Sequence, residues 1–349
     1  MKKRNGNVEL LRFLFAWIIV LFHGGLHFKG GYLAVEFFFT ITGFFLAEKI
    51  YLQNDGTISI ERSIIDATNY ILYRYKAIFP YLFISSIIGA IVQAIGKSWS
   101  VKGLILRMPY IIGDLLCVQN FGIPVMSATG VVWYLGAMFF AIWLIYPLLK
   151  IQYKLISYIA PVATSFISGL IVHTCGNLNA PNTTILGWIN TGFLRAILGI
   201  LLGITVFNLV QLIKIKLTSD MCWPITLIEI ICYTLYVTYM FVWKEGFGNG
   251  DILAVISMAC ALTCTMSKHS KLYGLFNNNV VYFFGNWSVP IFLNHFQWMI
   301  YMNTILQKLE VKCSAIIAKT IALIMVIVTS LFVYYTVKWL KRKLAKKYF

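Results

Sequence analysis

Charged side chains are scarce in this sequence, and acidic ones are the scarcest. Of the 349 residues, 12% are charged and 60% are hydrophobic, and the mean hydropathy is +0.79. Because a soluble domain carries about a quarter charged residues, this composition excludes an ordinary soluble protein and predicts an all-α polytopic membrane protein. The net charge is +17. We assign it to orientation in the membrane rather than to nucleic-acid binding, because the basic residues lie mostly between apolar runs.

Recognisable metal and signal motifs are also missing. The seven cysteines are scattered, with no CxxC pair and no histidine at metal-ligand spacing, so we expect small apolar side chains and no metal. The first apolar run contains Arg12 and His23 and is not followed by a small-residue cleavage site, which predicts a retained membrane span. No repeat or long polar linker divides the chain, so we expect one integral membrane domain over 1–349.

Apolar runs of about 20 residues mark the candidate spans. They lie near 9–28, 31–50, 77–95, 104–121, 131–149, 154–173, 187–209, 224–242, 251–267, 280–302 and 314–337. If 104–121 does not cross, most of the lysines and arginines fall on the side of both termini, which the positive-inside rule makes cytoplasmic. The sequence therefore predicts about ten transmembrane helices, a re-entrant or surface segment near 104–121, and a cytoplasmic loop over 51–76 with an amphipathic stretch.

Three ionisable residues interrupt the first two spans: Arg12, His23 and Glu36. On a straight helix Arg12 and His23 share one face, about 16 Å apart in depth. Intramembrane charges are functional-site candidates because they are costly without a partner or a hydrated cavity. We expect His23 to act as a general base, with Glu36 orienting it and Arg12 nearby. The alternatives are a packing histidine and a structural pair between Glu36 and Arg12.

Further cations and polar groups could complete such a site. Arg74 and Lys76 precede Pro80 and could hold an anionic donor or serve only as an orientation signal, and Arg195 lies within a span as a counter-charge or an anion contact. The other candidates are His295, which could equally cap a packed helix, together with Ser288, Trp133 and Tyr134, the last two of which could form an interfacial belt.

Several of these residues, in this order, resemble the acyltransferase-3 family of integral membrane acyltransferases. The resemblance rests on Arg12 with His23, on Leu33 to Phe44, on Arg74, Lys76 and Pro80-Tyr81, on Trp133-Tyr134-Leu135 with Pro147, on Arg195 with Gly199, and on Gly285, Ser288, Leu293 and His295. It covers nearly the whole chain. The departures are Ala34 where glycine is usual, Thr42 where serine is usual, and Ala77 where a second arginine is common.

The resemblance implies an enzyme of the cytoplasmic (inner) membrane that transfers an acyl group, usually acetyl from acetyl-coenzyme A, to a hydroxyl of a cell-surface polysaccharide or its lipid-linked precursor. The chain resembles the stand-alone form, without an extra periplasmic esterase-like domain. Two rival interpretations are a transporter or flippase of a glycolipid or small solute, and a non-catalytic component of a polysaccharide assembly complex.

Overall fold

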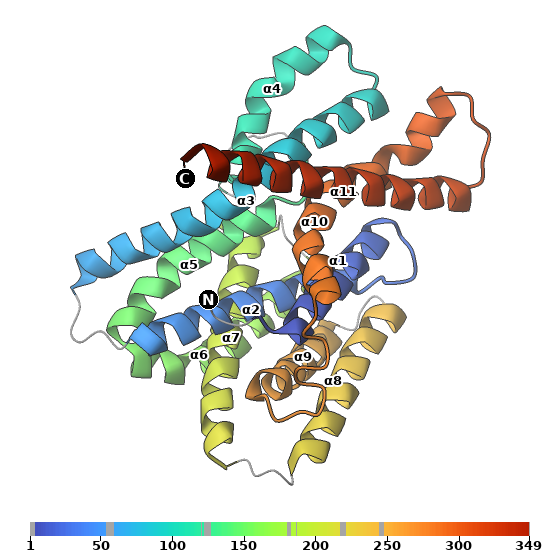
Figure 1. Ribbon diagram of the computed structural model, residues 1–349. Helices are drawn as coiled ribbons and strands as arrows, with labels where there is room; N and C mark the ends of the chain where they lie inside the picture. Colours follow the sequence, from blue (N-terminus) through green and yellow to red (C-terminus); the bar gives the residue numbers. More distant parts are fainter. Residues whose placement is uncertain are drawn as a thin grey trace.

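The computed structural model describes residues 4–53, 59–119, 121, 127–179, 183–185, 187–216, 221–243 and 248–348. These residues form eleven α-helices, one short 3-10 helix and one two-stranded hairpin (Figure 1). The elements are α1 (Gly6–His23), η1 (Gly31–Leu33), α2 (Ala34–Gln53), α3 (Ile60–Gly96), α4 (Val101–Leu115), α5 (Trp133–Ile151), α6 (Tyr153–Cys175), β1 (Thr184–Ile185), β2 (Ile189–Asn190), α7 (Thr191–Lys216), α8 (Cys222–Val242), α9 (Gly248–Ser267), α10 (Asn279–Lys308) and α11 (Ala315–Tyr348).

Each segment that the sequence predicts to span the membrane is a helix. Eight of the described helices are long and apolar enough to cross a bilayer: α1, α3, α5, α6, α7, α8, α9 and α11. The protein is therefore an all-α, multi-pass membrane protein. Helix α2 carries three charged residues, and α10 carries Asn294, His295 and Gln297. Because these polar groups lower their hydropathy, crossing by α2 and α10 stays a prediction.

The segment expected as a cytoplasmic loop over 51–76 is largely helical. Helix α3 runs without interruption from Ile60 to Gly96, 37 residues, which is about 55 Å at 1.5 Å per residue. Because the hydrocarbon core is only about 30 Å thick, α3 extends well beyond it. The Asn54-Asp55-Gly56 sequence at the start of this loop predicts a turn, but these three residues lie outside the described part of the chain.

Helix α4 fits a segment that does not cross. Its 15 residues span about 22 Å, which is too short for the hydrocarbon core. At its end the buried Asp114 carboxylate accepts a hydrogen bond from the Thr129 amide, at 3.0 Å. Burial raises the pKa of Asp114. The next segment of the chain is thereby tied back to α4.

Two helix pairs form the centre of the molecule. Helix α2 packs most extensively against α7, and α1 packs against α10, which lies between α1 and α11 (Figure 1). Glycines permit the first contact, because a Cβ at Gly43 would collide with the Ile200 backbone and one at Gly203 with the Thr40 backbone. Small residues allow transmembrane helices to approach in this way. Consecutive helices α1 and α2 are therefore not each other's main packing partners.

Candidate functional site

A cavity of about 370 Å³ opens among α1, α2, α3, α5 and α10. The N-terminal half of α1 provides Arg12 to its wall, and α3 provides Arg74. Phe38 of α2, Tyr134 of α5 and Phe292 of α10 also line it. Glu9 lies in the first turn of α1, whereas the Phe292 ring is 5.9 Å from that of His295, which contacts His23 in the last turn of α1. The cavity therefore has a charged end near the start of α1 and an aromatic end near Phe292.

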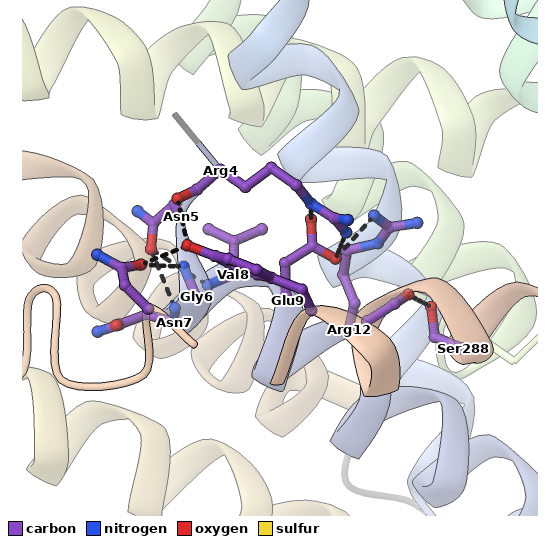
Figure 2. Close-up of polar contacts among 11 residues, drawn as sticks. Arg4, Asn5, Gly6, Asn7, Val8, Glu9, Arg12 and Ser288 are labelled. Atoms are coloured by element: carbon purple, nitrogen blue, oxygen red, sulfur yellow. Dashed lines mark hydrogen bonds and ion pairs between the residues drawn. The ribbon is translucent and has the colours of Figure 1, made fainter. Parts of the chain in front are cut away.

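The start of α1 is held in place by the segment before α10. The Asn5 side chain caps the helix by accepting from the amides of Asn7 and Val8, at 3.0 and 3.5 Å, which satisfies two of the free donors at a helix start. The Gly6 amide donates to Asn277 Oδ1 at 2.7 Å. Figure 2 shows this cap beside the charged residues that follow it. The start of α1, which forms the charged end of the cavity, is thereby held by its own cap and by the segment before α10.

Glu9 lies between two arginines at this end (Figure 2). Its Oε2 is 2.8 Å from Arg4 Nη2 and 3.4 Å from Arg12 Nη1. A Cβ at Gly285 of α10 would collide with the Glu9 carboxylate. The glycine therefore leaves the space in which Glu9 holds Arg12 at the cavity wall.

Cations outnumber acids along the cavity wall. Arg4, Arg12, Arg74 and Lys268 line it, against Glu9 and Glu48. The Arg74 guanidinium donates to the Tyr70 hydroxyl at 3.2 Å and lies over the Tyr70 ring, and within the described part of the chain it has no carboxylate partner. This end of the cavity therefore suits an anionic ligand.

Two histidines meet beyond the aromatic end. His295 Nε2 is 3.1 Å from His23 Nδ1, and His295 Nδ1 is 2.7 Å from the Phe292 carbonyl oxygen. His23 Nδ1 is also 3.1 Å from the carbonyl oxygen of Ile19. His295 is fully buried, whereas His23 is half-buried. The structure thus brings together two residues that the sequence suggested separately.

Of the aromatic residues that line the cavity, Phe292 is the one next to a histidine among the described ring contacts. The Phe292 ring is 5.5 Å from that of Tyr134 and 6.4 Å from that of Phe38, centroid to centroid. The Phe292 ring is also 5.9 Å from the His295 ring. His23 does not line the cavity, although Arg12 on the same helix does. Of the two residues that the sequence places on one face of this helix, Arg12 alone lines the cavity.

Glu36 does not contact His23 or Arg12 in the described structure. Its Oε1 accepts from Arg195 Nε at 2.7 Å, and both side chains are closed to solvent. Arg195 also donates to the Tyr32 carbonyl oxygen at 3.2 Å. The predicted contact between Glu36 and His23 is wrong, because α2 turns this carboxylate toward α7.

The remaining predicted residues divide between the cavity and its surroundings. Tyr134 and Ser288 line the cavity, and the Ser288 hydroxyl donates to the Gly285 carbonyl oxygen at 2.7 Å. The Trp133 ring instead faces the Arg195 guanidinium, 5.4 Å away. Lys76 is exposed and outside the cavity wall. Only Arg74 of the predicted donor-binding cations therefore lines the cavity.

Sequence reasoning missed Glu9 and Phe292. An acid three residues before Arg12 is a possible signal for the first, because side chains at that spacing meet on a helix. No comparable signal marks Phe292 among the 26 phenylalanines. Within the described residues, no group of three or more His, Cys, Asp or Glu side chains could hold a metal ion.

A family model described as an acyltransferase domain matches residues 5–338, which include every cavity residue named above except Arg4. Searches of curated proteins and of solved structures found no match.

Proposed function

This chain belongs to the acyltransferase-3 family, and from that membership and the geometry of its site we propose that it transfers an acetyl group from acetyl-coenzyme A to a hydroxyl. We propose a cell-surface polysaccharide or its lipid-linked precursor as the acceptor, and the cytoplasmic membrane as the location. The observation that carries the proposal is the cavity, which is lined by four cations and by Phe292, whose ring is 5.9 Å from that of His295 in the histidine pair.

The basic end supports an anionic donor. Coenzyme A carries phosphate groups, and Arg74 offers them a guanidinium without a carboxylate partner in the described structure. Lys268 and Arg12 lie on the same cavity wall. The volume of about 370 Å³ falls in the range of small-molecule sites. We place the phosphates at the charged end and the thioester arm toward Phe38, Tyr134 and Phe292.

In this scheme His23 performs the proton transfer. His23 Nε2 takes the proton from the acceptor hydroxyl, the hydroxyl oxygen attacks the thioester carbonyl, and the carbon–sulfur bond breaks. The departing thiolate then takes the proton from the imidazolium, so the products are an ester and free coenzyme A. A covalent relay, in which Nε2 first accepts the acetyl group, uses the same atom.

Contact between the thioester and His23 requires the aromatic rings to move. Phe292 contributes its ring to the cavity wall and its carbonyl oxygen to the His295 contact. We propose that the donor arm displaces this ring. The rings then exclude water from the site until the donor is bound.

The test uses purified protein in lipid nanodiscs with acetyl-coenzyme A labelled in its acetyl group. We expect release of free coenzyme A, and we expect surface glycans to lose the mass of acetyl groups when the gene is deleted. His23→Ala should abolish release, whereas the matched control His173→Ala, an exposed histidine on α6, should not. Protein that consumes no acetyl-coenzyme A would favour a carrier, and unchanged glycan acylation after deletion would favour a non-catalytic component. Wild-type turnover by His23→Ala would remove His23 from the scheme.

A further inference from the structure

The donor and the acceptor in the hydrogen bond between His23 and His295 follow from the carbonyl oxygens that the two rings also contact. A carbonyl oxygen only accepts hydrogen bonds, so the 2.7 Å contact with the Phe292 oxygen requires a proton on His295 Nδ1. In neutral His295 the other nitrogen, Nε2, then carries a lone pair. That lone pair faces His23 Nδ1 at 3.1 Å. His295 is therefore placed to accept a hydrogen bond from His23.

A second acceptor requires the same proton. His23 Nδ1 also lies 3.1 Å from the Ile19 carbonyl oxygen, one turn earlier in α1. Both neighbours of Nδ1 are acceptors, so Nδ1 carries the hydrogen in neutral His23. The lone pair of His23 is consequently on Nε2, and Nε2 has no hydrogen-bond partner within the described residues.

We infer that His295 is a positioning residue that holds His23 in the tautomer with Nε2 free to accept a proton. This inference rests on the proposed function, in which His23 is the base. The neutral imidazole of His295 thus takes the role predicted from the sequence for the Glu36 carboxylate, which is to orient the His23 ring. When Nε2 gains its proton, the Nδ1 hydrogen stays directed at His295 Nε2 and the Ile19 oxygen.

The position of His295 suits this role. It is fully buried on α10, the main packing partner of α1, and its ring is fixed by a carbonyl oxygen three residues earlier in its own helix. The Phe296 ring lies 5.0 Å from that of His23, centroid to centroid. The His23 ring is thus confined by α10 through both a hydrogen bond and an aromatic contact.

Two substitutions of His295, with side chains of different length, distinguish a positioning role from a packing role. In His295→Gln the terminal amide can occupy the place of Nε2 and offer its oxygen to His23. In His295→Asn the shorter side chain reaches only the place of Nδ1. We expect kcat of His295→Gln within about tenfold of wild type and kcat of His295→Asn lower by about 10²-fold, in the range of general-base contributions. KM for acetyl-coenzyme A should be unchanged in both.

A spectroscopic measurement tests the inference without relying on turnover. The chain has five histidines, so protein labelled with ¹⁵N in its histidine rings gives few signals, and His23→Gln assigns that of His23. We expect the wild-type signal of a ring protonated at Nδ1. In His295→Asn, with the Ile19 oxygen as the remaining acceptor, the share of this tautomer should fall.

The outcomes distinguish the two proposals. Wild-type His23 protonated mainly at Nε2 would overturn the role of His295 and the choice of Nε2 as the base, but not acetyl transfer itself. Equal kcat for His295→Asn and wild type, while His23→Ala is inactive, would overturn only the role of His295. Equal losses in the Gln and Asn variants would also overturn it, because packing alone would then explain them. Full activity of His23→Ala would remove His23 from the scheme and the role of His295 with it, whereas wild-type protein that consumes no acetyl-coenzyme A would overturn the proposed function.

Discussion

Glu36 and Arg195 form an ion pair that is closed to solvent on both sides, with Glu36 Oε1 2.7 Å from Arg195 Nε. The pair joins α2 to α7, and Arg195 also donates to the Tyr32 carbonyl oxygen before α2 begins. Two charges that interact inside the membrane protein rather than in its cavity indicate a structural role.

Breaking this pair should destabilise the protein. Arg195→Met or Glu36→Leu alone leaves one charge buried without its partner, which costs about 3–5 kcal/mol. The double variant should cost less than either single change, because no unpaired charge remains. Thermal unfolding of the purified proteins in one detergent measures the order. A Glu36→Leu protein with wild-type Tm but no turnover would show that Glu36 acts in the chemistry instead.

Removing the Arg74 guanidinium should weaken donor binding. A hydrogen bond to a charged group contributes about 1.5–3 kcal/mol, so Arg74→Ala should raise KM for acetyl-coenzyme A by about tenfold or more. Lys76→Ala removes the same charge two residues later from an exposed side chain outside the cavity and should have little effect. Initial rates over a range of donor concentrations compare the two. Equal shifts in both variants would mean that general electrostatic attraction, rather than the cavity wall, binds the donor.

Shortening Phe292 should open the cavity toward the histidines. Phe292→Ala removes the ring that meets Tyr134 and Phe38, so water should reach the thioester more easily. We expect more acetyl-coenzyme A hydrolysis per ester formed, measured as free coenzyme A against acylated acceptor. Phe166→Ala, at an exposed ring on α6, is the control. An unchanged ratio in Phe292→Ala would contradict the proposed barrier.

A methyl group at Gly285 should disturb the charged end of the cavity. Gly285→Ala would force the new Cβ against Glu9, at a cost of about 1–3 kcal/mol for overpacking, and would shift the carboxylate that holds Arg12. Gly169→Ala is a matched control, because this helical glycine of α6 has open space where the Cβ would be. Thermal unfolding should show a lower Tm for Gly285→Ala only. A Tm equal to that of the control would mean that α10 and Glu9 move apart to accommodate the methyl group without loss of stability.

Hydropathy predicted the helices, because an apolar run inside a bilayer must satisfy its backbone N–H and C=O groups within the segment, and an α-helix does so. It could not predict which helices pack together. Glu36 was expected near His23 because the two lie on consecutive spans, yet α2 packs mainly against α7 and α1 against α10. The same arrangement brings His295 to His23, although 272 positions separate them in the chain. Helix partners depend on side-chain fit, such as the glycines between α2 and α7, and hydropathy does not report that fit.

Phe292 takes part in two contacts through different atoms. Its ring belongs to the cavity wall, and its carbonyl oxygen anchors the imidazole that faces His23. A donor that displaces the Phe292 ring therefore moves the residue whose carbonyl oxygen holds His295 in place. In the proposed scheme, donor binding and the orientation of His23 are coupled through Phe292.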